Sequence, residues 1–183
     1  MPIFRTFSQS AAALKRTRIL AVAGLLAALQ IAVDTQALYL FGGTLSIKFG
    51  FLLVATSGML FGPVPAGLQA ALADVLTALL FPKGAYFPGY TLTALLSGFV
   101  YGCWFYGHTV TWKRALPAKA AINLCLNIGL NTLWISATQG HAVLAILPAR
   151  AVKNLVLLPI ETALIVAVAA ALRRVPAEFT RGQ

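Results

Sequence analysis

The chain has 183 residues, of which 60% are hydrophobic and only 10% are charged, and its mean hydropathy is +0.85. A soluble domain carries about 25% charged residues, so a soluble fold of this length could not bury so much apolar surface. The formal net charge of +10 would suit a nucleic-acid-binding protein, but most of the basic residues flank apolar segments, as membrane anchors do. The composition therefore favours an integral membrane protein, which uses lipid as its solvent.

Six apolar segments predict six membrane-spanning helices, at 19–33, 46–61, 64–81, 89–107, 117–138 and 143–172. The stretches between them are rich in Gly, Pro, aromatic or polar residues, which is typical of turns and loops. Six spans of this length cannot be barrel strands, so the expected architecture is an all-α, six-helix membrane bundle. The membrane domain is then 19–172, between a basic N-terminal segment (1–18) and a basic C-terminal tail (173–183).

The distribution of basic residues predicts the orientation of the bundle. Ten of them precede span one, separate spans four and five, or follow span six: Arg5, Lys15, Arg16, Arg18, Lys113, Arg114, Lys119, Arg173, Arg174 and Arg181. With an even number of spans these three regions share one side, whereas the other side has only Lys48 and Lys83 at its edge. The positive-inside rule therefore predicts that both termini are cytoplasmic.

The first span carries small residues at helical spacing. Ala23-x-x-x-Ala27 overlaps Gly24-x-x-x-Ala28, and small residues four apart allow a second helix to approach closely. That second helix could belong to a partner protein or to this chain.

An acidic residue and an aromatic loop mark the outer end of span three. Asp74 lies eight residues before Pro82. At about 1.5 Å per residue, this places it about 12 Å below the outer end of the helix. The loop FPKGAYFPGY (81–90) sets aromatic side chains among turn formers, so Tyr86 and Phe87 could form a lid or a stacking wall above a polar cavity. The alternative is simple anchoring at the membrane interface.

Span five carries polar residues at a regular interval. Asn123, Asn127 and Asn131 recur every four residues, and Trp134 follows three residues later. Asn131 and Trp134 lie near the outer end of the span, where an amide and an indole at one depth suit a flat heteroaromatic ligand. The alternatives are hydrogen bonding between helices for the asparagines and an interfacial belt position for the tryptophan.

Span six contains charged residues inside an apolar segment, LPARAVKNLVLLPIE (147–161). Five residues at i, i+3, i+4, i+7 and i+11 share one helix face: Arg150, Lys153, Asn154, Leu157 and Glu161. Such a face must turn away from lipid. Lys153 lies at a depth similar to that of Asp74, so the two could form an ion pair. The face could line an outward-facing cavity, or it could be a buried ion pair that only sets helix register.

No pattern typical of catalysis or of metal binding appears in the chain. It has no G-x-x-x-x-G-K-[ST] phosphate loop and no nucleophile with a neighbouring base, and His108 and His141 are expected on opposite sides of the membrane. Cys103 and Cys125 both lie in apolar runs, which is typical of core packing. The sequence therefore predicts no enzyme, no cofactor and no metal, and any pumping would draw its energy from a partner.

Several segments together resemble one family. They are GMLFGP (58–63), AD (73–74), YFPGYTLTALLSG (86–98), NTLWIS (131–136) and R-x-x-K-N (150–154). These segments resemble the substrate-binding membrane subunits (S components) of energy-coupling-factor vitamin transporters, in the folate branch. The resemblance covers nearly all of 16–172. It implies a six-helix, multi-pass protein of a prokaryotic cell membrane that captures a vitamin from outside.

The resemblance also implies partners and ligand contacts. The partners would be a transmembrane coupling subunit and two ATPase subunits, with Ala23 and Ala27 against the coupling subunit and no nucleic acid. The ligand would be folate or a related pterin, with Trp134 and the loop aromatics stacking on the ring and Asp74 or Asn131 contacting its pyrimidine edge. The glutamyl tail would meet basic residues: Arg150, Lys153, Lys48 or Lys83.

Two alternatives stay open at this point. The same architecture could bind another heterocycle or vitamin, such as a queuine-like base or pantothenate. The chain could also be a membrane scaffold or a small channel whose polar residues are purely structural.

Overall fold

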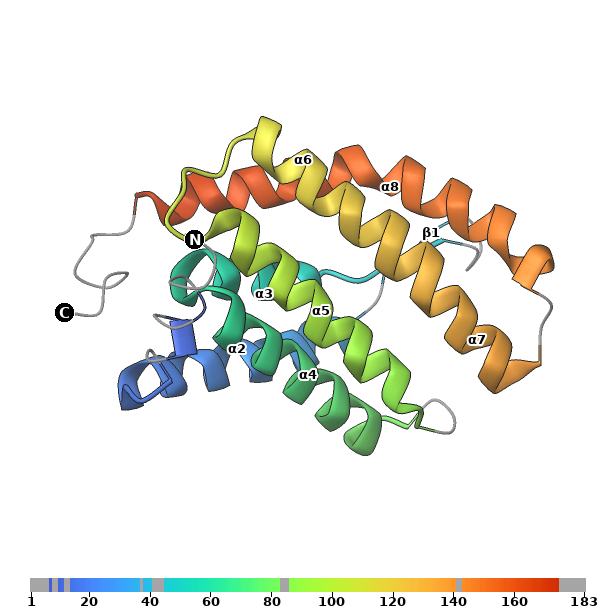
Figure 1. Cartoon of the computed structure of the whole chain (residues 1–183), viewed down its shortest axis with the longest axis horizontal. Helices are drawn as coiled ribbons and strands as arrows, with labels where there is room; N and C mark the ends of the chain where they lie inside the picture. The colour runs from blue at the N-terminus through green and yellow to red at the C-terminus, as the bar shows by residue number, and fades with distance from the viewer. Residues whose placement is uncertain are drawn as a thin grey trace.

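The computed structural model describes residues 7, 10–11, 14–36, 38–40, 45–82, 86–140 and 143–174, and it consists mainly of helices (Figure 1). In chain order the elements are α2 (Thr17–Thr35), β1 (Leu38–Leu40), β2 (Leu45–Ile47), α3 (Gly50–Phe61), α4 (Pro63–Leu80), α5 (Pro88–Phe105), α6 (Trp112–Ala121), the π-helix η1 (Ile122–Leu130), α7 (Asn131–Gln139) and α8 (Val143–Leu172). The elements α6, η1 and α7 follow one another without a break and form one long rod (Figure 1).

The helices agree closely with most of the predicted spans. The α8 helix covers the predicted sixth span, and α4 and α5 each begin one residue before the predicted start. Within the part of the chain that the structure describes, four helical segments are long and apolar enough to cross a membrane: Thr17–Thr35, Pro63–Leu80, Trp112–Thr138 and Leu147–Leu172. The prediction of a helical, multi-pass membrane protein is therefore confirmed. The count of six crossings and the cytoplasmic position of the termini stay predictions, and Lys83, Arg5, Arg181 and His141 lie outside the described residues.

Two predicted boundaries are wrong. The second helix begins at Gly50 rather than at 46, because Leu38–Leu40 and Leu45–Ile47 pair as short antiparallel strands, which an all-α prediction did not include. The helix α3 therefore has 12 residues, a length of about 18 Å at about 1.5 Å per residue. The fifth helix begins at Trp112 rather than at 117, since helical structure continues through Pro117. As a result, Lys113, Arg114 and Lys119, which were expected between spans four and five, lie within α6.

Small residues bring α3, α4 and α5 close together. A Cβ added at Gly98 would lie 2.5 Å from the carbonyl oxygen of Ala66, and one added at Gly58 would lie 2.9 Å from the backbone nitrogen of Gly102. Side chains larger than glycine would push these backbones apart. The close packing of α4 against α5 brings a polar residue in the C-terminal half of α4, Asp74, into contact with Thr91 at the start of α5.

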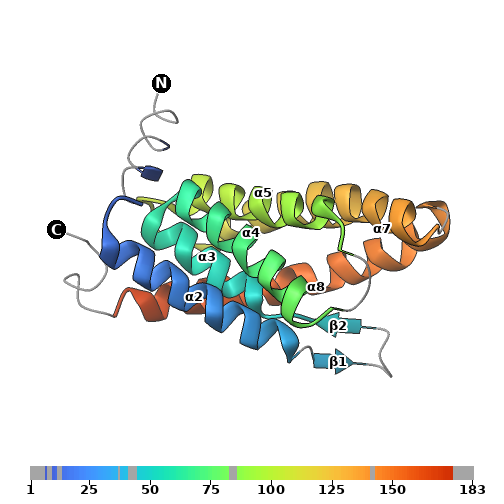
Figure 2. The same cartoon turned by 90° about the horizontal axis from the view of Figure 1, so that it is seen from below.

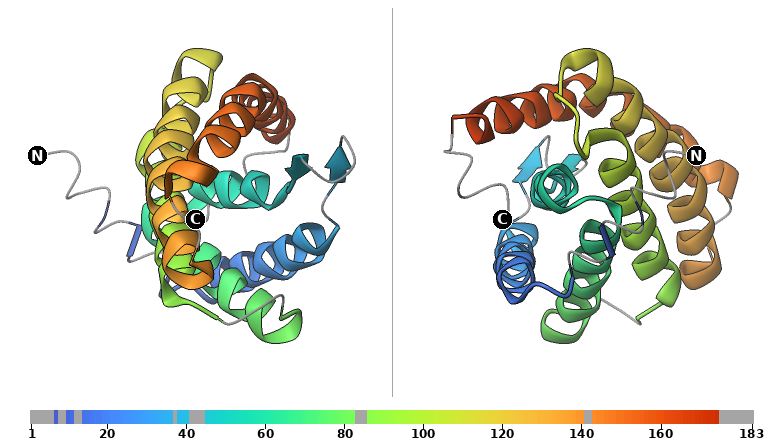
Figure 3. Two further views of the ribbon diagram at one scale, coloured as in Figure 1. Left: turned by 90° about the vertical axis from the view of Figure 1, so that its right-hand side faces the viewer. Right: turned by 60° about the vertical axis from the view of Figure 1, so that its left-hand side comes forward.

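The two ends of the bundle differ in composition. The start of α2, the loop between α5 and α6 and the end of α8 lie at one end, whereas the β1–β2 hairpin lies toward the other (Figure 2). At the first end Arg173 Nη2 donates a hydrogen bond to the carbonyl oxygen of Val110, at 2.9 Å. In the end view, α3 lies between α2 and α8 and contacts both (Figure 3). Apart from Lys119, the described basic residues that are expected to face the cytoplasm belong to segments at this one end: Lys15, Arg16, Arg18, Lys113, Arg114, Arg173 and Arg174.

Candidate ligand-binding site

A cavity of about 750 Å³ lies inside the bundle, and each of the helices from α2 to α8 contributes residues to its wall. This volume is within the range of about 300–1,000 Å³ that is usual for small-molecule sites. Seven of the predicted ligand contacts line it: Lys48, Asp74, Tyr86, Phe87, Asn131, Arg150 and Lys153. The structure thus brings together residues from α4, α7, α8 and the loops before α3 and α5, although their contact with a ligand stays a prediction.

Aromatic side chains form one wall of the cavity near the start of α5. The ring centroids of Phe87 and Trp134 are 5.4 Å apart, and those of Phe87 and Tyr90 are 6.1 Å apart. Gly89 makes this packing possible, because an added Cβ there would lie 2.7 Å from Trp134 Cδ2. Trp134 Nε1 donates to Thr93 Oγ1 at 3.1 Å. Trp134 is not among the lining residues, so it supports Phe87 from behind, while Phe87 and Tyr90 face the cavity.

Asp74 is held by a hydrogen-bonded neighbour on the next helix. Thr91 Oγ1 donates to Asp74 Oδ2 at 2.7 Å, and Tyr86 and Thr91 share a hydrogen bond of 2.8 Å between their hydroxyl oxygens. A threonine hydroxyl has one hydrogen, so Tyr86 must be the donor in the second bond. The contact with Thr91 could not be predicted from spacing within one helix, and a direct Asp74–Lys153 ion pair stays a prediction.

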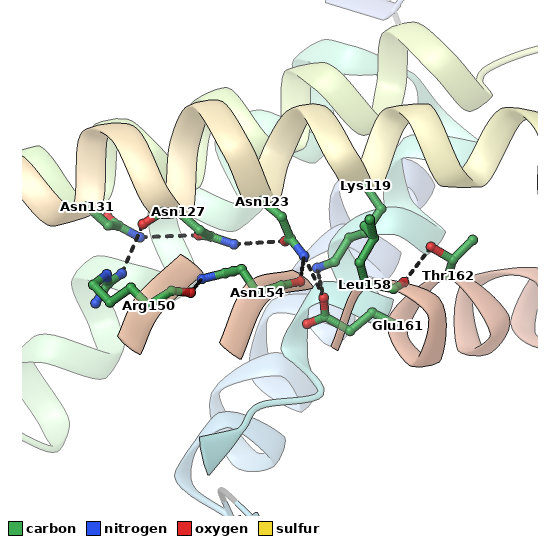
Figure 4. A network of polar contacts seen from close by, with 9 residues as sticks. All are labelled: Lys119, Asn123, Asn127, Asn131, Arg150, Asn154, Leu158, Glu161 and Thr162. Atoms are coloured by element: carbon green, nitrogen blue, oxygen red, sulfur yellow. Dashed lines mark hydrogen bonds and ion pairs between the residues drawn. The ribbon is translucent and has the colours of Figure 1, made fainter. Parts of the chain in front are cut away.

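The asparagines of η1 and α7 form an asparagine ladder (Asn123, Asn127 and Asn131; Figure 4). Asn131 Nδ2 donates to Asn127 Oδ1 at 3.2 Å, and Asn127 Nδ2 donates to Asn123 Oδ1 at 3.1 Å. Asn123 Nδ2 donates in turn to the Asn154 carbonyl oxygen at 3.2 Å and to Glu161 Oε2 at 3.0 Å. The ladder therefore connects the rod of α6, η1 and α7 to α8. Part of it lies in a π-helix, a rare geometry that is common at functional sites.

The asparagine ladder has its inner end at Asn123 and its outer end at Asn131, and the inner end contacts a buried ion pair. Lys119 Nζ lies 3.2 Å from Glu161 Oε2 and 4.1 Å from the centroid of the Phe51 ring. Lys119 is only 2% exposed. Its assignment as a cytoplasmic anchor is therefore wrong: α6 begins at Trp112, so Lys119 lies about two turns into the helix, on the face that packs inward.

The polar face of α8 lines the cavity, as its spacing predicted. All five of its members are lining residues: Arg150, Lys153, Asn154, Leu157 and Glu161. Arg150 Nη2 donates to the carbonyl oxygen of Asn127 at 3.0 Å. Arg150 Nε is buried and has no hydrogen-bond partner among the described residues. An unsatisfied cationic donor in a cavity wall is chemically suited to an anionic group of a ligand.

Two polar residues of α2 are not among the predicted ligand contacts. Gln30 and Asp34 both line the cavity. Gln30 Oε1 accepts a hydrogen bond from Gln69 Nε2 at 3.3 Å, and Asp34 Oδ1 accepts one from the backbone N–H of Gly50 at 3.1 Å. The available signal was their spacing, since two polar residues four apart in an apolar span share one face.

The small residues of α2 divide between two environments. Ala27 is 3% exposed and is buried against this chain, whereas Ala23 is partly buried. Ala28 is exposed, and a Cβ added at Gly24 would meet nothing within 4 Å. Of the two overlapping motifs, the one formed by Gly24 and Ala28 thus lies on the outer surface of the bundle.

Comparison with known proteins agrees with this architecture. A family model described as "ECF transporter, substrate-specific component" matches residues 18–169. Over 119 residues the chain is 44% identical to a protein named "Folate transporter FolT" from Clostridium novyi (strain NT), an alignment that covers 65% of this chain and 69% of the relative. Over 123 residues it is 33% identical to a "Folate transporter FolT" from Leuconostoc mesenteroides subsp. mesenteroides, covering 64% of this chain and 66% of the relative.

A solved structure gives the same result. A crystal structure of FolT bound with folic acid matches with a TM-score of 0.75 and 35% identity, covering 88% of this chain and 95% of that chain. The predicted resemblance is confirmed because the family match spans most of the membrane domain. The chain belongs to the family of ECF transporter substrate-specific components.

Proposed function

We propose that this chain captures folate or a closely related pterin from outside a prokaryotic cell and delivers it through an ATPase-driven coupling module. The names of two relatives and the folic acid in a similar solved structure support this ligand. The observation that carries the proposal is the pairing, in one cavity, of an aromatic wall with an unsatisfied guanidinium nitrogen of Arg150.

Folate has the complementary chemistry at its two ends. Its pterin ring is flat and carries N–H groups along one edge, which suits stacking on Phe87 and Tyr90 and hydrogen bonding to the Asp74 carboxylate. Its glutamyl tail is a dianion, which suits Arg150, Lys153 and Lys48. A ligand with one flat, hydrogen-bonding end and one anionic end therefore matches the side chains that line the cavity.

The proposal includes the topology and the partners. The bundle crosses the membrane six times with both termini in the cytoplasm, supported by the grouping of basic residues at one end. It works with a transmembrane coupling subunit and two ATPase subunits, as the family implies. The coupling subunit contacts the small residues of α2 that this chain does not fully bury, namely Ala23, Gly24 and Ala28. Small side chains allow such close contact between helices.

Calorimetry on the purified chain in detergent or nanodiscs tests the ligand. Folic acid should bind, and pteroic acid, which lacks the glutamyl tail, should bind more weakly. Arg150→Met should weaken folic acid binding by about 2–5 kcal/mol, because a ligand carboxylate loses its buried partner. The same variant should weaken pteroic acid binding much less.

Controls distinguish this outcome from others. Arg114→Met changes an arginine at the other end of the bundle, where Arg114 Nη1 contacts the Trp104 carbonyl oxygen, and it should leave both affinities unchanged. Binding of pantothenate or a queuine-like base in place of folic acid would overturn the ligand assignment. An equal loss for folic acid and pteroic acid in Arg150→Met would remove Arg150 from the tail site.

A further inference from the structure

We propose that the asparagine ladder fixes the hydrogen-bonding polarity of the ligand site. In this proposal Asn131 presents its Oδ1 acceptor at the free end of the ladder, so the ligand must place an N–H donor against that oxygen. Asn131 contacts the ligand, while Asn123, Asn127 and Glu161 are positioning residues that act through it. The inference rests on the proposed function, because the donor is sought on the ring of a pterin.

The polarity begins at the inner end of the ladder. An ammonium can only donate, so Glu161 Oε2 must accept from Lys119. The Nδ2 group of Asn123 has two hydrogens, and its two partners are the same carboxylate oxygen and the backbone carbonyl oxygen of Asn154. Both partners are acceptors, so rotating the Asn123 amide by 180° would place oxygen against oxygen twice. The orientation of the Asn123 amide is therefore determined by its surroundings.

This orientation passes outward along the ladder (Figure 4). Because Asn123 turns Oδ1 toward Asn127, the Asn127 amide must donate through Nδ2, at 3.1 Å. Asn127 then turns Oδ1 toward Asn131, so the Asn131 amide must donate through Nδ2, at 3.2 Å. Each amide has one donor end and one acceptor end, so a reversal at any step would oppose two like groups. Asn131 Oδ1 is left at the outer end, buried and without a partner among the described residues.

The unpartnered oxygen has a consequence for ligand choice. A buried acceptor is stabilised by a donor and is penalised when a lone pair faces it. An isolated asparagine could rotate to suit either kind of ligand atom, but Asn131 cannot rotate without breaking the ladder. Asn131 also lies one turn before Trp134, which packs against Phe87 of the aromatic wall, so in this proposal the ring end of the ligand contacts Asn131.

Folic acid and its 4-amino analogue, 4-amino-4-deoxyfolic acid, provide a matched pair of probes. Folic acid has an N–H at ring position 3 next to a carbonyl, whereas the analogue has a bare nitrogen at position 3 next to an amino group. The wild-type chain should prefer folic acid by about 5- to 100-fold, the range expected when a built hydrogen-bonding site meets a group that cannot pair. Both affinities are measured by calorimetry on the full chain in nanodiscs.

Asn127→Leu tests the positioning role. This change removes the hold on Asn131, which can then rotate and accept either ligand, so the preference should fall to within about twofold. Asn131→Leu removes the Oδ1 acceptor itself and should reduce the preference in the same way. It gives a second test if the first variant folds poorly. The matched control is Asn154→Leu. Asn154 also lines the cavity, but its Nδ2 donates to the Arg150 carbonyl oxygen in its own helix.

The outcomes separate the two proposals. A preference that collapses in Asn127→Leu and Asn131→Leu but persists in Asn154→Leu supports the inference. Equal weakening of both ligands in Asn127→Leu, with the preference unchanged, overturns it, since a purely structural ladder would give that result. A wild-type chain that binds both compounds equally also overturns it. If the wild-type chain binds neither compound, the proposed function itself fails.

Discussion

Thr91 Oγ1 donates a hydrogen bond of 2.7 Å to Asp74 Oδ2, and this bond joins the start of α5 to the C-terminal half of α4. The same hydroxyl oxygen is 2.8 Å from the Tyr86 hydroxyl, so the aromatic loop, α5 and the carboxylate form one chain of hydrogen bonds. One oxygen of Asp74 is thereby occupied. Thr91 thus sets how the carboxylate is presented to the cavity that it lines.

Replacing Thr91 should weaken ligand binding through the position of Asp74. Thr91→Val keeps the shape but removes the donor, and it should lower the affinity for folic acid by about 5- to 20-fold, since a hydrogen bond to a charged group is lost. Thr91→Ser keeps the hydroxyl and should restore most of the affinity. Calorimetry measures both variants. A serine variant as weak as the valine variant would show that packing, and not the hydrogen bond, is what matters.

Lys119 and Glu161 should stabilise the fold through their interaction with each other. Side-chain exposures are 3% for Lys119 and 12% for Glu161. Lys119→Met alone should destabilise the fold by about 3–5 kcal/mol, because it leaves an unpaired carboxylate in a buried position. Thermal unfolding in detergent should show that the double variant with Glu161→Gln loses less stability than the two single variants added together. Strict additivity would mean that the two groups do not interact in the membrane.

Adjacent alanines on α2 give a matched test of the partner surface. Ala28 is exposed and Ala27 is 3% exposed, so a tryptophan at each position should have different consequences. Ala28→Trp should leave folding and folic acid binding intact but abolish uptake of labelled folate, because the bulky ring keeps the coupling subunit away. Ala27→Trp should lose folding and binding together, since the core has no room for it. Normal uptake by Ala28→Trp would place the docking site elsewhere.

Cysteine labelling tests the topology. Thr109 lies in the exposed loop between α5 and α6, and Pro82 is exposed after α4. In a background with Cys103→Ala and Cys125→Ala, Pro82→Cys should react with a membrane-impermeant thiol reagent in intact cells. Thr109→Cys should react only after the membrane is opened, because the positive-inside rule places that loop in the cytoplasm. Reaction of both positions in intact cells would contradict the six-span arrangement.

Hydropathy and helical periodicity predict the class of this protein and two of its polar faces. Hydropathy alone identifies lipid as the solvent, since no soluble core could absorb this composition. Helical periodicity identified the polar face of α8, from Arg150 to Glu161, because positions three and four apart share a face whatever the neighbours are. The same periodicity found the asparagine ladder, whose members are all in one rod.

Which polar groups contact one another depends on the tertiary structure. Lys119 was predicted as an anchor because the sequence does not show where a helix that tolerates Pro117 begins, nor that Glu161 of another helix lies beside it. The hydrogen bond from Thr91 to Asp74 and the support of Phe87 by Trp134 also join different helices. Such pairs depend on how close two backbones come, which glycines such as Gly98 and Gly89 determine through contacts with residues distant in the chain. The periodicity of one helix contains no information about that distance.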